Sequence, residues 1–219
     1  MKHDDDPTVD PSPMISTSTM TLLFATLAVL AAVAAVILHA VRWLPLPDAR
    51  RSLARLLDGQ EVQLAFVVAL VATLGSFYLS EVAHFLPCRL CWYQRIAMYP
   101  LPVLLGIAWW KRDAGIRRYV VPLALIGLLI STYHILVERF PSLEDSGVCE
   151  VSNPCTIRWV ERFGFVTIPT MAFAGFALIS GLLLHPAPGA AATTDPSSPS
   201  SSSPTTDSPA PLSPSESQP

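Results

Sequence analysis

The sequence has little charge for its length. Charged residues make up 14% of its 219 residues, whereas soluble domains carry about 25%. Hydrophobic residues make up 51%, and mean hydropathy is positive. Because charge is excluded from hydrocarbon, this composition indicates a membrane protein. The net charge of −3 gives no argument for nucleic-acid binding, and the sequence has neither a Gly-rich phosphate loop nor an HExxH-type metal signature.

Long apolar runs stand where charge is missing. A membrane-spanning helix needs about 20 largely apolar residues, and five stretches qualify. They cover residues 20–41, 62–83, 90–110, 119–138 and 165–184. Only helices and closed barrels satisfy the backbone in lipid, and the period-two alternation of a barrel is absent. We therefore predict an all-α membrane protein, with a four-helix transmembrane bundle as its core over 62–184 and one extra N-terminal transmembrane helix over 20–41.

Both ends of the chain are poor in basic residues. Residues 1–19 are acidic, with Lys2 as the one clear positive charge, whereas a secretory signal has a basic leader and a shorter apolar run. We predict an extracytoplasmic segment over 1–19 followed by an uncleaved span; a cleaved signal is the alternative. Residues 185–219 are rich in Pro and Ser and contain no Lys or Arg, which predicts a disordered tail.

Basic residues predict the orientation of the spans. They are densest in the linker over 42–61 and in the short linker after 90–110: Arg42, Arg50, Arg51, Arg55, Lys111, Arg112, Arg117 and Arg118. Cytoplasmic linkers carry such an excess, so these two are predicted to face the cytoplasm. Cys88 and Cys91, and likewise Cys149 and Cys155, then lie on the extracytoplasmic side, where disulfides persist.

The spacing of the cysteines favours redox exchange over structural support. Cys88-x-x-Cys91 closes a very short loop, so a disulfide there would restrict the unfolded chain little. Two structural disulfides are one alternative. A zinc site of four thiolates is another, but the five residues between Cys149 and Cys155 are not the tight spacing of a second zinc knuckle, and we predict no metal.

The first pair also has a favourable chemical environment. Pro87 and Cys88 are suited to begin a helix, which places Cys91 in its first turn, where the helix dipole favours a thiolate. Arg95 follows one turn later on the same face. A charge at mid-membrane costs roughly 2.5–3.5 kcal/mol, so Arg95 is predicted to stabilise the thiolate or an anionic reduced cofactor. The alternative is an arginine that snorkels to the head groups.

Two segments resemble a known family. The first is Cys88-x-x-Cys91-Trp92-Tyr93-Gln94-Arg95 with Met98-Tyr99-Pro100-Leu101 after it, and the second is Gly164-Phe165-Val166-Thr167-Ile168-Pro169-Thr170. Both are similar to the DsbB/BdbC family of disulfide-formation proteins, over residues 62–184. Cys-x-x-Cys alone is a weak signal, but the extended motif, the second cysteine pair and the matching topology are specific together.

The resemblance implies a protein-dithiol:quinone oxidoreductase of the bacterial inner membrane. Such a protein reoxidises a DsbA-like extracytoplasmic thiol oxidase and passes the electrons to a membrane quinone, ubiquinone or menaquinone. By that resemblance, Cys88 and Cys91 form the disulfide next to the quinone, with Cys91 at its ring and Arg95 beside its oxygen. Cys149 and Cys155 form the second disulfide, on a mobile outer loop, where the partner's thiolate attacks Cys149 first.

Other features of the outer side are less specific. His134 is an ionisable group near the outer end of a span, and the resemblance places a histidine near the quinone; the alternative is a histidine bonded to a helix carbonyl. The short spacing from Cys149 to Cys155 is closer to the BdbC branch, and Asn153-Pro154 predicts a turn there. Amphipathic helices are predicted at the membrane surface over 51–57 and 157–163.

Two other functions stay open. A vitamin-K-epoxide-reductase-like quinone enzyme would place Cys-x-x-Cys near the end of a later span, without Gln94-Arg95 after it. A non-enzymatic membrane protein with structural disulfides would never exchange Cys88–Cys91 with Cys149–Cys155.

Overall fold

Helices form the regular structure of the chain in the computed structural model, which describes residues 17–45, 47–57, 59–150 and 152–184. The main helices in chain order are α1 (Thr17–Trp43), α2 (Pro47–Leu57), α3 (Glu61–Phe77), α4 (Arg89–Met98), α5 (Pro100–Lys111), α6 (Arg117–Arg139) and α7 (Ile168–Leu184). A π-helical turn, Tyr78–Val82, extends α3, and 3-10 turns cover Ala114–Ile116 and Pro141–Ser146. The predicted all-α membrane fold is confirmed.

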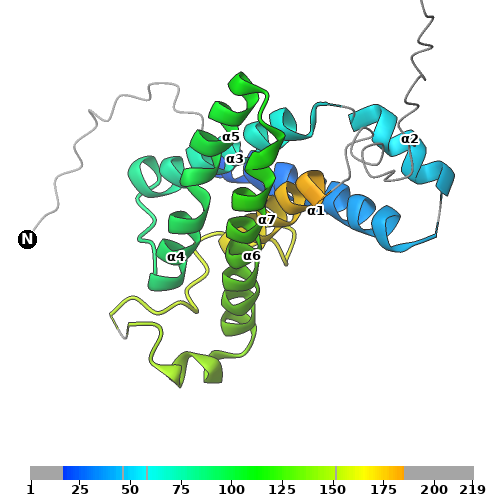
Figure 1. Ribbon diagram of the computed structural model, residues 1–219. Helices are drawn as coiled ribbons and strands as arrows, with labels where there is room; N and C mark the ends of the chain where they lie inside the picture. Colours follow the sequence, from blue (N-terminus) through cyan, green and yellow to red (C-terminus); the bar gives the residue numbers. More distant parts are fainter. Residues whose placement is uncertain (1–16, 46, 58, 151, 185–219) are drawn as a thin grey trace, which may run out of the picture. The chain divides into compact units, whose positions relative to one another are not determined.

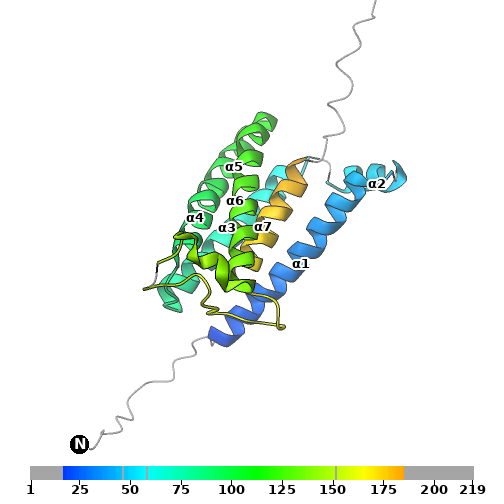
Figure 2. The same cartoon turned by 90° about the horizontal axis from the view of Figure 1, so that it is seen from below.

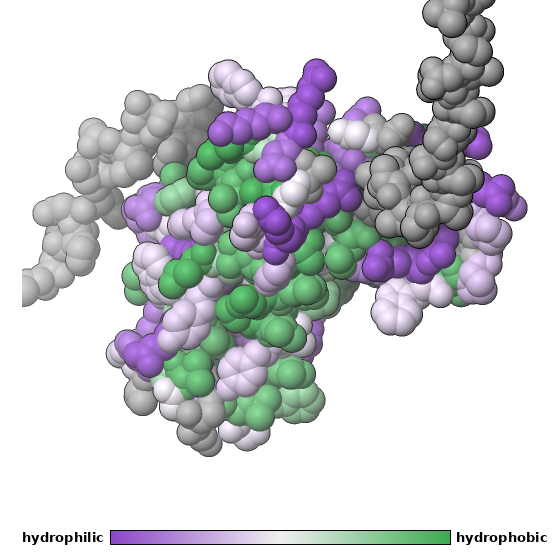
Figure 3. Space-filling model, in the orientation of Figure 1, coloured by the Kyte–Doolittle hydropathy of each residue, from purple (hydrophilic) through white to green (hydrophobic). Residues whose placement is uncertain are grey.

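Several helices have the length and surface of membrane spans. Within the described residues, α1, the continuous segment Glu61–Val82 and α6 are long and apolar enough to cross a membrane, and α7 is a shorter apolar helix. Large apolar side chains point outward, with Val36 67% exposed and Leu129 70% exposed. Figure 3 shows hydrophobic residues across much of one face. A surface of this kind is suited to lipid and would be costly in water.

The third predicted stretch, 90–110, is divided between α4 and α5. Tyr99 keeps helical backbone angles, so the chain continues in nearly the same course. Pro100 has no N–H to donate to the carbonyl one turn earlier, and its ring crowds that turn. The predicted span is therefore present as two helices that meet at a proline.

α7 forms the centre of the bundle. It packs along α6 and along α1, and Figures 1 and 2 show it between these two helices. Phe176 of α7 is fully buried against Gly127 of α6, where an added Cβ would lie only 2.3 Å from the ring. Gly127 is thus required for the close approach of the two helices.

The two predicted amphipathic helices had different outcomes. The helix over 51–57 is confirmed as part of α2. The prediction of a helix over 157–163 is wrong, because this segment is irregular and ends in a turn that pairs Arg162 with Val166. Phe163 and Gly164 have positive φ angles of 53° and 74°, which a right-handed helix does not accommodate. The predictions for most of 1–19 and for the tail after Leu184 lie outside the described residues.

Candidate active site

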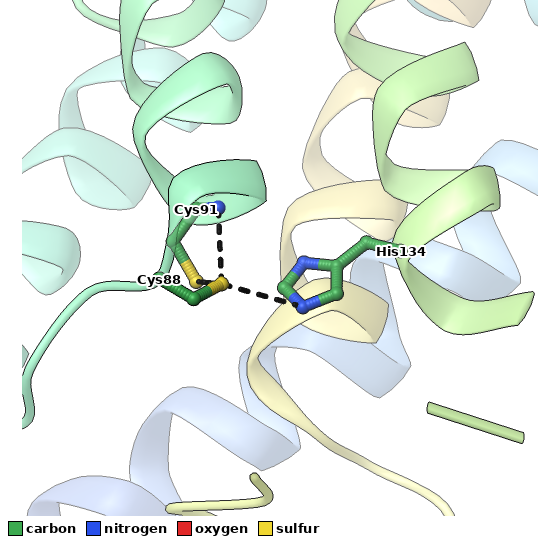
Figure 4. Close-up of side chains that lie close together, drawn as sticks. All are labelled: Cys88, Cys91 and His134. Carbon is green, nitrogen blue, oxygen red and sulfur yellow. Dashed lines mark hydrogen bonds between the residues drawn. The ribbon is translucent and has the colours of Figure 1, made fainter. Parts of the chain in front are cut away.

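The inner cysteine pair, Cys88 and Cys91, lies where α4 begins. Cys88 is the N-cap residue, with extended backbone angles of φ −71° and ψ 173°. Its Sγ accepts a hydrogen bond from the backbone N–H of Cys91 at 3.4 Å and lies 3.0 Å from the Cys91 Sγ (Figure 4). Both are free cysteines in this structure, and their sulfurs are close enough for a disulfide to form with little movement.

The helix N-terminus favours a thiolate on Cys88, where the sequence had predicted Cys91. Cys88 precedes α4, and its sulfur faces the first turn, where N–H groups lack helical partners. A thiolate there accepts from the thiol of Cys91. This hydrogen bond, followed by the contacts of His134, holds the pKa of Cys88 well below its ordinary value of 9.0, against the opposing effect of burial.

His134 joins the two cysteine pairs. It is 2% exposed, and its Nε2 lies 3.2 Å from the carbonyl oxygen of Cys155. The same nitrogen lies 3.6 Å from the Sγ of Cys88 (Figure 4). A carbonyl oxygen only accepts, so Nε2 carries the hydrogen. Nδ1 is then free to accept from the amide nitrogen of Gln94, at 3.4 Å. The histidine is therefore bonded to a carbonyl, as in the alternative, but that carbonyl belongs to the outer cysteine pair.

The outer pair, Cys149 and Cys155, forms a disulfide with Cα atoms 5.9 Å apart. Cys155 is 1% exposed, whereas Cys149 is partly exposed. The carboxylate of Glu144 accepts from the backbone N–H of Cys155 at 2.6 Å and from the hydroxyl of Thr156 at 3.0 Å. These hydrogen bonds hold an otherwise irregular loop in one conformation.

The outer loop is also attached to the start of α4. Asn153 donates to the carbonyl oxygen of Pro87 at 3.0 Å, and Arg89 pairs with Glu150 at 2.6 Å. Cys88 and Cys155 consequently belong to one cluster of buried residues. The structure thus brings together two pairs that are far apart in the sequence.

Arg95 and Cys91 line one cavity of about 460 Å³. The guanidinium of Arg95 lies over the ring of Trp92 and donates to the carbonyl oxygen of Ser76 at 3.4 Å. The cavity volume is within the range of small-molecule sites. Among the described residues, those that line this cavity do not include His134, which borders a small neighbouring cavity together with Cys91.

Some residues of the site were not singled out from the sequence. Gln94 is 5% exposed and contacts the ring of His134, which it orients. It stands next to Arg95 in the family motif, but the motif alone indicates no role of its own for it. Glu138 is buried one turn after His134 and accepts from the hydroxyl of Thr167 at 2.7 Å. The spacing of four residues on α6 could have pointed to Glu138, because such residues share a helix face.

The cysteines do not form the four-thiolate arrangement of the zinc alternative, because Cys149 and Cys155 are bonded to each other. Cys88, Cys91 and His134 do place their ligand atoms within 4.8 Å of one another. A structural zinc site needs four protein ligands, and the fourth is not offered by this group. The roles of Cys88, Cys91, Cys149, Cys155, Arg95 and His134 stay predictions.

Comparison with known proteins assigns the family. The family model described as Disulfide bond formation protein DsbB matches residues 60–184. The chain belongs to the DsbB family. Disulfide bond formation protein C of Bacillus subtilis (strain 168) is 47% identical over 115 residues, which are 52% of this chain and 83% of the relative. A probable disulfide formation protein of Coxiella burnetii (strain RSA 493 / Nine Mile phase I) is 41% identical over 133 residues, 60% of this chain and 90% of the relative. No solved structure matches.

Membership of the DsbB family confirms the resemblance found in the sequence. Together with the apolar helices, it makes the chain a multi-pass membrane protein with an oxidoreductase role in disulfide bond formation. The matched residues include both cysteine pairs and leave α1 and α2 outside. The vitamin-K-epoxide-reductase-like alternative has no support from this match.

Proposed function

We propose that this DsbB-family protein reoxidises a DsbA-like, thioredoxin-fold thiol oxidase outside the cytoplasm and passes two electrons to a membrane quinone. One observation carries the proposal: the outer disulfide, the inner pair and the apolar cavity are contiguous. Cys155 shares a buried cluster with Cys88, and Cys91 opens on the cavity. In the net reaction, a partner dithiol and a quinone give a partner disulfide and a hydroquinone.

The exposure of the outer pair supports an order of attack. Cys149 is partly exposed, while Cys155 is 1% exposed. A thiolate of the partner therefore reaches the sulfur of Cys149, forms a mixed disulfide and releases Cys155 as the thiolate. The leaving sulfur is the buried one, next to the inner pair.

Transfer between the pairs uses the contact of Cys155 with Cys88. With the inner pair oxidised, the Cys155 thiolate attacks Cys88 and breaks the Cys88–Cys91 bond, which leaves the electron pair on Cys91. The partner closes its own disulfide and releases Cys149. Cys149 then attacks Cys155, restoring the outer disulfide and freeing Cys88. These exchanges leave the outer pair as a disulfide and the inner pair as a dithiol.

The cavity beside Cys91 fits a quinone. Gln94, Arg95 and Cys91 give it a polar end, and most of its other lining residues are apolar. A quinone bound there would accept two electrons and two protons. The Arg95 guanidinium is placed to stabilise negative charge in an apolar setting, where such stabilisation is strong. Cys88, 3.0 Å from Cys91, is placed to close the inner disulfide again.

The cellular location follows from the charge pattern. Lys111 and Arg117 lie at one end of the spans, and the cysteine pairs lie at the other end of α4 and α6. By the positive-inside rule, this pattern supports an extracytoplasmic position for the cysteines, and we propose the bacterial cell (inner) membrane from the family. There the partner's substrates are exported proteins that acquire disulfides.

The variant Cys91→Ser tests the proposal. Purified wild-type protein should turn over with a reduced thioredoxin-fold thiol oxidase and a quinone. The turnover rate of the variant should be lower by about 1,000-fold or more, because a covalent redox group is removed. Hydroquinone formation is followed anaerobically by absorbance. The Cys149–Cys155 disulfide, checked by mass spectrometry, should persist in the variant and serves as the control for folding. Unimpaired turnover of the variant would refute the proposal.

A further inference from the structure

α1 forms a wall of the cavity beside Cys91, although it precedes the residues that the family model matches, 60–184. Ala28 and Ala31 of α1 line the cavity together with Val67 and Val71 of α3. At the outer end, the ring of Phe24 packs against Tyr78, with centroids 5.8 Å apart. The family core alone would therefore leave this side of the cavity open.

α1 is attached to the core by specific contacts near both ends. Near its start, Arg162 of the outer loop donates to the hydroxyl of Ser18 at 2.9 Å and to that of Thr21 at 2.8 Å. Near its end, His39 Nε2 lies 3.2 Å from the carbonyl oxygen of Ala177 in α7. A helix that served only as an anchor would need none of these hydrogen bonds. Its position beside the cavity is thus set by the fold.

The polarity of the cavity changes along its length. Cys91, Gln94 and Arg95 lie at one end, next to Ser76. From Ser76 to Val67 the cavity follows nine residues of α3, about 13 Å at 1.5 Å per residue, and apolar side chains line this part. A ligand complementary to both parts has a polar, redox-active head and a long apolar tail.

We infer that α1 completes a channel for the isoprenoid tail of the quinone and that Ala28 and Ala31 set its width. The inference rests on the proposed function, because it extends the same cavity away from Cys91. Both alanines are partly exposed toward the cavity, so their small side chains leave volume that a larger residue would fill. This assigns a substrate-selecting role to a helix outside the family core.

The test compares two quinones that share one ring, one without a tail and one with several isoprene units. Ala28→Phe and Ala31→Phe should raise KM for the tailed quinone at least about tenfold, since a filled apolar pocket excludes its ligand. KM and kcat for the tail-less quinone should stay unchanged. Val33→Phe is the matched control, because Val33 is on the same helix, 53% exposed, and does not line the cavity.

The outcomes separate the two proposals. Wild-type protein that reduces neither quinone contradicts the proposed function and the tail channel together. If wild-type protein turns over and Ala28→Phe and Ala31→Phe behave like Val33→Phe, the tail channel alone is overturned. A lipid acyl chain is then the occupant of the cavity. Equal losses of activity with the tailed and the tail-less quinone also overturn the tail channel, because they show a general disturbance of the site that binds the ring. Thermal unfolding of all variants in detergent confirms that each is folded.

Discussion

The two cysteine pairs are held by different kinds of structure. Cys88 and Cys91 lie at the N-terminus of a helix as free cysteines, and Cys91 borders an apolar cavity. Cys149 and Cys155 stand in an irregular loop, form a disulfide and have one partly exposed member. The helix supplies N–H groups that favour a thiolate, whereas the loop depends on individual hydrogen bonds for its conformation.

This difference separates two tasks. Under the proposed function, the outer pair needs a sulfur that a soluble partner can reach, and a surface loop provides one. Under the same proposal, the inner pair needs a stable thiolate, which a helix N-terminus favours, and an apolar cavity beside it. His134 connects the two environments through Cys155 and Cys88. We therefore expect substitutions near the inner pair to alter the ionisation of its thiols. Substitutions near the outer loop should alter mainly how that loop is held against the start of α4.

The largest expected effect concerns the ionisation of Cys88. Cys91→Ala removes the hydrogen bond that contributes most to lowering the Cys88 pKa, so that pKa should rise toward 9.0. With a lowered pKa, the thiolate is present at neutral pH and is lost only as the pH falls through that pKa; in Cys91→Ala it should already be lost at a higher pH. Thiolate absorbance in the ultraviolet, measured against pH, reports this. Cys91→Ser retains a donor and should keep the pKa low, and equal titration of both variants would contradict the assignment.

An intermediate effect is expected at the connection between the pairs. His134→Phe leaves the buried carbonyl of Cys155 without its donor, which costs about 1–3 kcal/mol of unfolding free energy. His39→Phe is the matched control, because the ring of His39 also contacts a backbone carbonyl, that of Ala177 in α7, away from the cysteine pairs. Both variants should lose stability to denaturant, but only His134→Phe should slow the exchange between the pairs. Equal exchange rates in the two variants would show that His134 has no part in the transfer.

The smallest effect is expected at the edge of the outer loop. Arg89 and Glu150 pair at 2.6 Å, but their side chains are 42% and 55% exposed, so solvent screens the pair. A double-mutant cycle with Arg89→Ala and Glu150→Ala should give a coupling of at most about 1 kcal/mol. The coupling, measured from the equilibrium reduction of Cys149–Cys155, should shrink with added salt. A larger, salt-independent coupling would mean that this pair, and not the buried contacts, holds the loop.

Local features of the fold followed from the sequence. Helices lie over every predicted apolar stretch, because the length of an apolar run and the need to satisfy the backbone in lipid are local properties. The division at Pro100 could have been foreseen from proline alone. The helix predicted over 157–163 failed because Trp159 stacks on Phe85 and Arg158 donates to the Glu138 carbonyl, contacts that the local pattern does not contain.

The sequence by itself determined the class of the protein, the alignment of both cysteine pairs on one side and the position of Arg95 one turn from Cys91, since topology and helical spacing are enough for these. Only the tertiary structure decided that His134 lies between the pairs and that α1 walls the cavity. Cys88 and His134 are 46 residues apart, and Arg162 and Thr21 are 141 apart. Such contacts depend on how helices pack around α7, which side-chain volumes decide and which no local pattern records.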